Sequence, residues 1–265
     1  MTNELQADAV RQNVRQSYAD VAKRAGAGKC GCSGKTSCCG TPDSRQTSRQ
    51  LGYSEEELAA VPDGANMGLG CGNPQAIAAL QPGEVVVDLG SGGGFDCFLA
   101  AQRVGETGLV IGVDMTPEMI SKARKNAEDG QYTNVEFRLG EIEALPVADG
   151  IADVIISNCV INLSPDKPRV YREAYRVLKT GGRLAISDVV AIAEMPREMR
   201  EDMALLSGCI SGATSQAESE TMLRAAGFSR VSTTVNASSR EYIREWAPGR
   251  GIEAFVASAT IEAIK

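Results

Sequence analysis

The sequence contains no histidine among its 265 residues. Histidine is the usual general base near neutral pH and the commonest side-chain ligand of protein-bound metals. Mechanisms that pair a serine or cysteine with histidine, and metal sites that need imidazole, are therefore excluded. The chemistry of this chain must use thiols, carboxylates and backbone groups, or proceed without a proton transfer.

An excess of positive charge and a long apolar segment are also missing. Lysine and arginine number 27 against 34 aspartates and glutamates, a net charge of −7, so we expect no nucleic-acid partner. The longest apolar candidate, residues 154–163, is too short to cross a bilayer, and the first residues lack the apolar core of a signal peptide. We therefore expect a soluble cytoplasmic protein with no membrane partner, in which the eight cysteines are reduced thiols.

Strand and helix patterns alternate from residue 84 onward. This alternation predicts an α/β fold with a Rossmann-like core, in which a mostly parallel sheet with an antiparallel edge has helices on both faces. Strands are predicted near 85–89, 109–113, 135–139, 153–157, 183–190, 229–235 and 254–262. Helices are predicted over 95–104, 117–127, 167–179, 196–206 and 216–226, the third of them closed by Gly181 and Gly182.

The segment before residue 84 has a different composition. Apolar residues at helical spacing predict a helix over 5–25, which either packs on the core or acts as a lid. Residues 26–50 are polar and glycine-rich, which predicts a flexible loop. This loop contains Cys30, Cys32, Cys38 and Cys39.

Two cap signals follow the loop. Ser54 and Glu57 form a capping box for a short helix, and Asn73 with Pro74 begins a helix over 75–80. We expect three parts in the chain. They are an N-terminal helix with the cysteine-rich loop at 1–50, a cofactor-binding domain at 51–195, and a smaller C-terminal α+β portion at 196–265 that completes the sheet and the substrate site.

Residues 90–94 read Gly-Ser-Gly-Gly-Gly and join the first predicted strand to a helix. Glycine has no Cβ and tolerates positive φ, so such a turn brings bare backbone against a ligand. Asp88 precedes the turn, and Asp114 ends the next strand, where an acidic side chain binds ribose hydroxyls. A carboxylate before the turn suits a cationic ligand, and here the stretch resembles motif I of the class I S-adenosylmethionine-dependent methyltransferases. A generic nucleotide-binding turn and a purely structural turn are the alternatives.

Three cysteines fall in loops near the expected ligand site. Cys159 follows strand 153–157, whereas Cys71 and Cys209 have glycine-flanked positions. Ligands bind beyond the carboxyl ends of the strands in an open α/β sheet, and three thiols there can hold a soft, three-coordinate centre. The alternative for Cys159 is a small buried hydrophobic residue. Cys97, inside a helix, is expected to pack in the core.

Together these stretches resemble the arsenite methyltransferases. The resemblance implies that Cys71, Cys159 and Cys209 hold trivalent arsenic, that S-adenosylmethionine donates the methyl group, and that the products are methylated arsenicals made for detoxification. It also implies a further thiol from either Cys38 or Cys39. The stretches are 69–74 (LGCGNP), 88–94 (DLGSGGG), 157–163 (SNCVINL), the flanks of Cys209, 245–249 (EWAPG) and 257–262 (ASATIE).

The implied reaction agrees with the missing histidine. Thiolate-bound arsenic(III) keeps a lone pair that can attack the sulfonium methyl without a general base, so positioning and exclusion of water would supply the catalysis. Methylation formally oxidises arsenic, and two nearby thiols could return the electrons by forming a disulfide. We predict that Cys38 or Cys39 resolves an oxidised Cys71 and that thioredoxin or glutathione resets it. A zinc site in the same loop is the alternative.

The glycine turn and the resemblance also predict the cofactor site. The aspartate before the turn and the turn backbone should lie near the amino-acid end of S-adenosylmethionine. The aspartate that ends the second strand should hold the ribose, and the residue after it and segment 140–143 should enclose the adenine. The predicted residues are Asp88, Gly90, Ser91, Gly92, Gly94, Asp114, Met115, Glu141, Ile142, Glu143 and Asn158.

Two other functions fit part of the pattern. A methyltransferase acting on carbon, oxygen or nitrogen would share the core, and it would need a base such as Glu141 or Glu143. A metalloid sensor on an inactive scaffold would use the thiols without turnover. Conversion of arsenite to methylated products by labelled cofactor separates these hypotheses.

Overall fold

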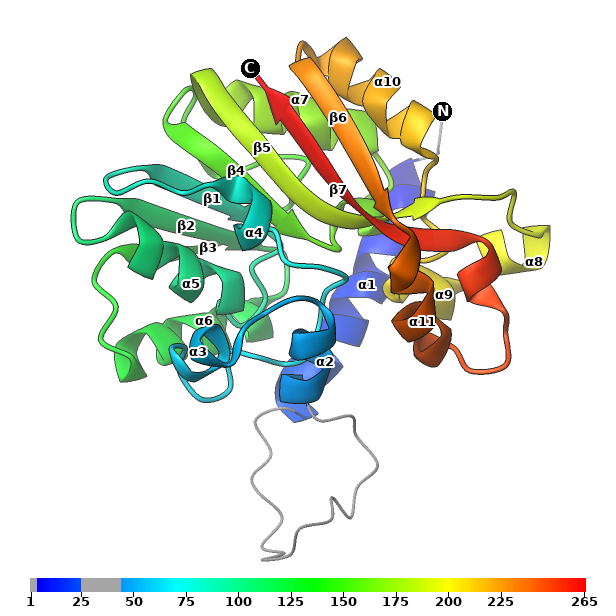
Figure 1. Cartoon of the computed structure of the whole chain (residues 1–265), viewed down its shortest axis with the longest axis horizontal. Helices are drawn as coiled ribbons and strands as arrows, with labels where there is room; N and C mark the ends of the chain where they lie inside the picture. Colours follow the sequence, from blue (N-terminus) through cyan, green and yellow to red (C-terminus); the bar gives the residue numbers. More distant parts are fainter. Residues whose placement is uncertain (1–3, 25–43) are drawn as a thin grey trace, which may run out of the picture.

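The computed structural model describes residues 4–24 and 44–265, which form a central seven-stranded sheet (Figure 1). The strand order is β3-β2-β1-β4-β5-β7-β6, and β7 runs antiparallel to both of its neighbours whereas β1 to β5 are parallel. This confirms the predicted fold class. The strands are β1 (Val85–Leu89), β2 (Leu109–Asp114), β3 (Val135–Leu139), β4 (Ala152–Asn158), β5 (Leu178–Ala191), β6 (Ser229–Asn236) and β7 (Val256–Ile264).

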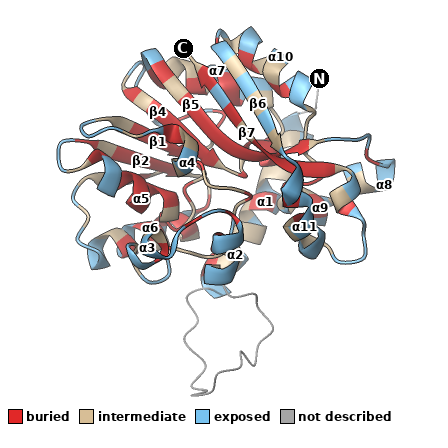
Figure 2. Cartoon of the chain, in the orientation of Figure 1, coloured by how far each residue is buried: buried red, intermediate tan, exposed pale blue. Residues whose placement is uncertain are grey.

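Helices cover both faces of the sheet, and the strands between them are the most deeply buried part of the molecule (Figure 2). Successive strand residues serve opposite faces, as Val86 packs with Phe98 of one layer and Val87 with Tyr171 of the other. Full burial of such a side chain contributes about 1.5–3 kcal/mol. The layers are α5 (Phe95–Val104) with α6 (Pro117–Asp129), and α7 (Lys167–Val177) with α10 (Gln216–Ala226).

The N-terminal helix α1 (Glu4–Arg24) lies beyond the carboxyl ends of the parallel strands, where it contacts α6 and α9 (Figure 1). Its position places it beside the loops that follow β1, β2 and β4. The shorter elements are α2 (Ser44–Gln50), α3 (Glu55–Ala59), α4 (Gln75–Ala78), η1 (Ile161–Leu163), α8 (Arg197–Arg200), α9 (Met203–Ser207), η2 (Ala237–Ser239), α11 (Arg240–Ile243), η3 (Arg244–Trp246) and η4 (Ile252–Ala254).

Local signals at helix starts are partly confirmed. The capping box of Ser54 and Glu57 is present at the start of α3. The Asn73 side chain accepts a hydrogen bond from the Gln75 N–H (3.0 Å), but α4 ends at Ala78 because Ala79 adopts a left-handed φ of 47°. The predicted helix over 75–80 is therefore two residues too long.

Three element predictions were wrong. A single helix over 196–206 is instead α8 and α9, since the Asp202 carboxylate accepts from the N–H groups of Ala204 and Leu205 and starts a new helix. Gly181 and Gly182 lie inside β5 rather than closing α7. Residues 44–50, predicted as loop, form α2, where the buried Ser48 hydroxyl bonds Asn66 (3.0 Å). The four cysteines of the predicted loop lie outside the described residues.

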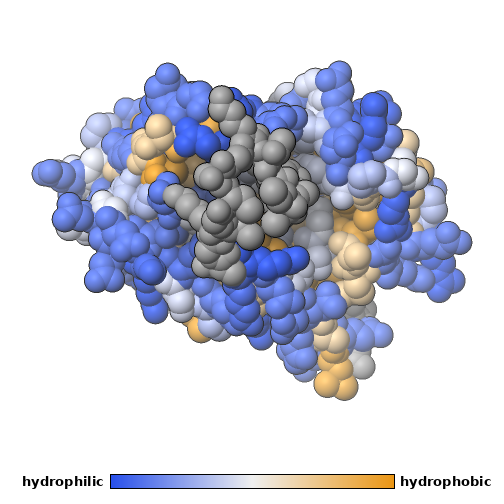
Figure 3. All heavy atoms as spheres, turned by 90° about the horizontal axis from the view of Figure 1, so that it is seen from below, coloured by the Kyte–Doolittle hydropathy of each residue, from blue (hydrophilic) through white to orange (hydrophobic). Residues whose placement is uncertain are grey.

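One face of the molecule is mostly hydrophilic. Seen from below, hydrophilic residues predominate and hydrophobic residues form small separate groups (Figure 3). Within residues 4–24 and 44–265, no helix combines the length and the apolar content needed to cross a bilayer.

Candidate active site

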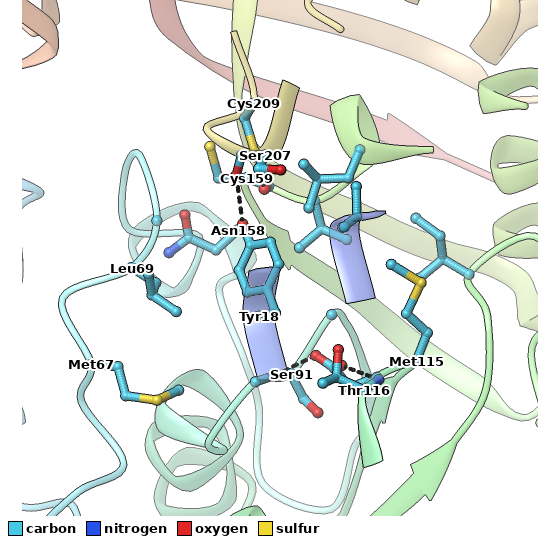
Figure 4. A pocket seen from close by; sticks show the side chains of 18 of the residues that line it. Tyr18, Met67, Leu69, Ser91, Met115, Thr116, Asn158, Cys159, Ser207 and Cys209 are labelled. Carbon is cyan, nitrogen blue, oxygen red and sulfur yellow. Dashed lines mark hydrogen bonds between the residues drawn. The ribbon is translucent and has the colours of Figure 1, made fainter. Parts of the chain in front are cut away.

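A cavity of about 330 Å³ opens at the carboxyl edge of the sheet. The turn after β1, the end of β2 and the loop after β4 contribute to its walls because parallel strands end at the same edge. In Figure 4, Cys159 and Cys209 lie together at one end, Ser91, Met115 and Thr116 lie at the other, and Tyr18 of α1 stands between them. The cavity therefore joins the glycine turn to two of the predicted thiols.

The glycine turn adopts the backbone that its sequence predicts. Gly90, Gly92 and Gly94 have φ of 73°, 51° and 92°, which an L-residue adopts only with strain. The Ser91 hydroxyl is buried in the cavity wall without a hydrogen-bond partner, so it is free to bind a ligand. At Gly90 the backbone is close to another part of the protein, because a Cβ there would overlap the Val160 side chain.

Carboxylates dominate the end of the cavity beside the glycine turn. Asp88, Asp96 and Asp114 all line it. Burial, and then the neighbouring Asp96, raise the pKa of Asp88 well above its usual value, and burial raises the pKa of Asp96 to about 6. Such raised pKa values mean that the anionic forms lack a compensating cation. A ligand that brings positive charge would relieve this, as predicted for Asp88.

Asp114 braces the glycine turn from the end of β2. Its carboxylate accepts hydrogen bonds from the N–H groups of Gly92 (3.0 Å) and Thr116 (2.8 Å), one on each oxygen. Each carboxylate oxygen can accept a further bond, so the side chain can brace the turn and still hold a ribose diol. Met115 and Ile142 line the same end of the cavity, where adenine is expected.

Helix α1 forms the roof of this cavity. Arg11, Val14 and Tyr18 line it from above. Arg11 pairs with Glu143 (3.2 Å) and Glu141 (3.4 Å), and the Tyr18 hydroxyl donates to the Ser207 carbonyl (3.3 Å). The helix therefore packs on the core through Val14 and also lies over the cavity.

Cys71, Cys159 and Cys209 come together in one hydrophobic cluster, although they are far apart in the sequence. The sulfurs of Cys71 and Cys159 lie within 4.8 Å of each other, and Cys209 Sγ donates to the Cys159 carbonyl (2.6 Å). All three side chains are buried. Cys159 and Cys209 line the cavity, whereas Cys71 is not part of its wall.

The backbone at two of the thiols is strained. Cys159 and Cys209 have φ of 59° and 62°, a conformation that costs an L-residue about 1–2 kcal/mol. Strain of this kind concentrates at functional sites, where surrounding contacts enforce it. Here the Cys159 N–H donates to the Ser187 carbonyl (2.8 Å) and the Cys209 N–H to the Leu206 carbonyl (2.8 Å).

Asn158 connects the thiols to the helix after the glycine turn. Its Oδ1 accepts from the Cys71 N–H (3.0 Å), and its Nδ2 lies near the Tyr53 hydroxyl (3.0 Å) and the Asp96 carboxylate (3.3 Å). The Tyr53 hydroxyl in turn donates to Asp96 (2.7 Å). The side chain predicted to touch the cofactor thus also fixes the Cys71 loop.

The thiols are protonated in this environment. Burial raises the pKa of Cys71 to about 11. The hydrogen bond with Cys159 and then burial raise the pKa of Cys209. For Cys159 the bond with Cys209 lowers the pKa, but the bond with Cys71 and burial outweigh it. Each thiol therefore has to lose its proton to a binding partner before it can act as a thiolate ligand.

Two residues predicted to bind the cofactor, Gly94 and Glu141, are not part of the cavity wall. A Cβ at Gly94 would meet Phe98 and Phe137. Glu141 faces the arginines of α1 rather than the cavity. Cys97 is buried in the core, as predicted, and its thiol donates to Asp88 (3.2 Å).

Other residues of the site escaped sequence reasoning. Asp96 and Asp188 carried a usable signal, since each is the one charged residue in a mainly apolar stretch, 95–99 and 184–190. Tyr18, Arg11 and Tyr53 had none, because a helical or loop pattern does not reveal which distant element it contacts.

Comparisons with known proteins agree with this geometry. Residues 80–227 match the family described as a methyltransferase domain. The chain is 52% identical over 260 residues to an arsenite methyltransferase of Halobacterium salinarum, which covers 96% of this chain and 66% of that protein. It is 49% identical over 166 residues to an arsenite methyltransferase of Aquipseudomonas alcaligenes, which covers 60% of this chain and 47% of that protein. The chain thus spans about two thirds and about half the length of these two curated relatives.

Among solved structures, the chain is similar to an arsenic(III) S-adenosylmethionine methyltransferase from Chlamydomonas reinhardtii. The TM-score is 0.63 at 34% identity, and the match covers 83% of this chain and 73% of that one. A protein of Galdieria sulphuraria described as a putative sarcosine dimethylglycine methyltransferase shares the fold, at 18% identity and a TM-score of 0.60 over 72% of this chain and 82% of that one.

Proposed function

We propose that this chain, which belongs to the arsenite methyltransferase family, transfers the methyl group of S-adenosylmethionine to trivalent arsenic bound by Cys71, Cys159 and Cys209. One observation carries the proposal: a carboxylate-lined cavity and a buried cluster of three thiols meet at one edge of the sheet. Methylated arsenicals would be the products, and their release would serve detoxification.

The cavity residues fit the chemical groups of S-adenosylmethionine. Asp88 is a buried carboxylate without a cationic partner, which suits the ammonium end of the cofactor. The unpartnered Ser91 hydroxyl and the turn backbone can donate to its carboxylate. Asp114 can accept from the ribose diol, and Met115 and Ile142 offer apolar contacts to adenine. The bound cofactor supplies an electrophilic methyl group.

The protonated thiols suit arsenite as the substrate. Arsenous acid is neutral near pH 7, and its three hydroxyls can leave as water when three thiols give up their protons to them. This exchange produces a neutral tris-thiolate of arsenic and needs no external base, in agreement with the absence of histidine. Thiolates are also the ligands that a soft centre prefers.

The residues around the thiols contribute position and exclusion of water. Tyr18 of α1 covers the cavity between its two ends, and Val14 of the same helix lines it. Asn158 fixes the Cys71 loop relative to the glycine turn. Arsenic retains a lone pair after it binds three thiolates, so alignment with the methyl group is the main requirement.

A redox step follows from the same chemistry. Transfer of a methyl cation to the lone pair formally oxidises arsenic by two electrons, which two thiolates return by closing a disulfide. We propose that Cys38 or Cys39 resolves the oxidised Cys71 and that an external reductant, thioredoxin or glutathione, reopens it. Both cysteines lie outside the described residues. Replacing both with serine should leave binding intact and stop turnover after the first cycle, and full multiple turnover would contradict the proposal.

The central test uses single Cys→Ser variants of Cys71, Cys159 and Cys209. Each should lose arsenite affinity and the production of labelled methylated arsenicals while keeping cofactor affinity, because a hydroxyl is a much weaker ligand for arsenic. Cys97→Ser is the matched control, since Cys97 is equally buried but contacts Asp88 instead of the thiols. Full methylation by two of the three variants would refute the arsenic site. Methylation of an organic acceptor alone would favour a different methyltransferase, and arsenite binding without turnover would favour a sensor.

A further inference from the structure

One buried charged group beside the thiols has no part in the arsenic reaction. A carboxylate oxygen of Asp188, from β5, lies within 4.8 Å of the sulfurs of Cys71 and Cys159, which lie within the same distance of each other. Three thiols already satisfy trivalent arsenic, so this carboxylate is not needed as a ligand. All three side chains are buried.

Asp188 is held rigidly in this place. Its Oδ1 accepts from the Val189 N–H (2.7 Å) and the Asn162 side chain (2.9 Å), and its Oδ2 accepts from the Ile161 N–H (3.0 Å). None of these donors is a cation. A carboxylate oxygen can accept about two bonds, so Oδ2 has capacity for one more partner.

We propose that Cys71, Cys159 and Asp188 form a binding site for a soft divalent cation, zinc or cadmium, which excludes arsenite by occupying two of its three thiols. Two sulfurs and one carboxylate oxygen are a recognised donor set for such ions. A tetrahedral zinc ion with bonds of about 2.0–2.3 Å separates its ligands by about 3.5–3.8 Å. Small rotations of the two cysteine side chains therefore bring their sulfurs into range of an ion bound to the fixed carboxylate, and water can complete the shell from the cavity side.

The charge balance of metal binding differs from that of arsenite binding. Two protonated thiols and one carboxylate have a charge of −1, and so does a dication bound to two thiolates and that carboxylate, because two protons are released to solvent. Because binding releases protons, metal affinity must then rise with pH. Arsenous acid instead takes the thiol protons away as water and releases none.

The two ligands also depend on different residues. The third ligand of arsenic is Cys209, whose thiol donates to the Cys159 carbonyl. The third ligand of the divalent cation is Asp188 instead of Cys209. Asp188→Asn should lower zinc and cadmium affinity at least about tenfold, since loss of even an indirect partner of a metal typically costs 10- to 100-fold, and should leave arsenite affinity near wild type. Cys209→Ser should do the reverse.

The experiment uses the reduced full-length chain without cofactor, so its outcome does not depend on methyl transfer. Cys30, Cys32, Cys38 and Cys39 are replaced with serine in every sample to remove competing thiols. Zinc and cadmium chloride are titrated calorimetrically in buffers of different ionisation enthalpy, which gives the number of protons released. The absorption of cadmium–thiolate bonds is recorded in parallel. Arsenite is then added as a competitor. Asp153→Asn is the matched control, because it also removes one negative charge. Asp153 lies near the start of β4, at the end of the strand away from Cys159, and pairs with Lys179.

The expected result is one ion per chain, release of two protons, displacement by arsenite, and opposite losses in Asp188→Asn and Cys209→Ser. Absence of cadmium–thiolate absorption, or an unchanged metal affinity in a folded Asp188→Asn, overturns the proposal. Should Asp188→Asn fail to fold, the decision rests on Cys71→Ser and Cys209→Ser, since only the first should lose the metal.

Discussion

Replacement of Gly90 with alanine tests how closely the cofactor turn and the thiol loop are packed. A Cβ at Gly90 would overlap Cγ2 of Val160 and lie 2.7 Å from its Cγ1, and the residue has a φ of 73°. The left-handed backbone costs alanine about 1–2 kcal/mol, and forcing an extra methyl group into a packed site costs typically about 1–3 kcal/mol. We expect Gly90→Ala to lower the free energy of unfolding by about 2–5 kcal/mol, which many domains survive. Because Val160 follows Cys159, arsenite affinity should also fall.

The matched control is Gly150→Ala, where φ is 62° but no atom lies within 4 Å of the added Cβ. Urea denaturation of both variants separates the backbone cost, common to both, from the overlap, which only Gly90→Ala suffers. The double variant Gly90→Ala with Val160→Ala should regain part of the lost stability. Equal destabilisation by the two glycine substitutions would refute the reasoning.

Three further outcomes are expected. Asp114→Asn should weaken cofactor binding by about 1.5–3 kcal/mol, the range for hydrogen bonds to a charged group, and an unchanged affinity in calorimetry would contradict the ribose assignment. Burial raises the pKa of Asp96 from 3.8 to about 6, so the stability that this group contributes is complete below pH 3.8 and is lost as the pH rises towards 6. The urea midpoint of the wild type should therefore fall between these two pH values, and Asp96→Asn should reduce that fall. An unchanged dependence of the midpoint on pH would contradict this. Arg11→Ala leaves the buried Glu143 carboxylate without its cation, so it should speed hydrogen exchange in α1 and weaken cofactor binding. Lys23→Ala breaks an exposed pair with Glu118 and should change both measurements little.

The sequence was sufficient to predict the sheet and the position of the main groups. Strand runs bounded by glycine turns gave β1 to β4 nearly to the residue, and because parallel strands end at one edge, Asp88, Asp114 and Cys159 had to lie close together. The gathering of the three thiols depended more on the resemblance, since spacing along the chain says little about which loops meet.

The errors have identifiable physical causes. Glycines at 181 and 182 usually end a helix, but here a register shift between Ala152 and Val154 lets β5 begin early, at Leu178. Helix α2 has no strong periodic pattern, and tertiary contact through Ser48 stabilises it. The roof contacts of Tyr18 and Arg11 join elements about a hundred residues or more apart, which no local pattern encodes.

The shared roof formed by α1 has a consequence for the extent of methylation. Arg11 covers the cofactor end of the cavity and Tyr18 reaches the loop of Cys209, so one movement of this helix opens both ends at once. Spent cofactor and methylated arsenic would then leave through the same opening. Whether arsenic gains a second methyl group becomes a competition between two rates, cofactor exchange and product escape, during each opening. Variants that loosen α1 would therefore shift the mixture of products as well as the turnover rate.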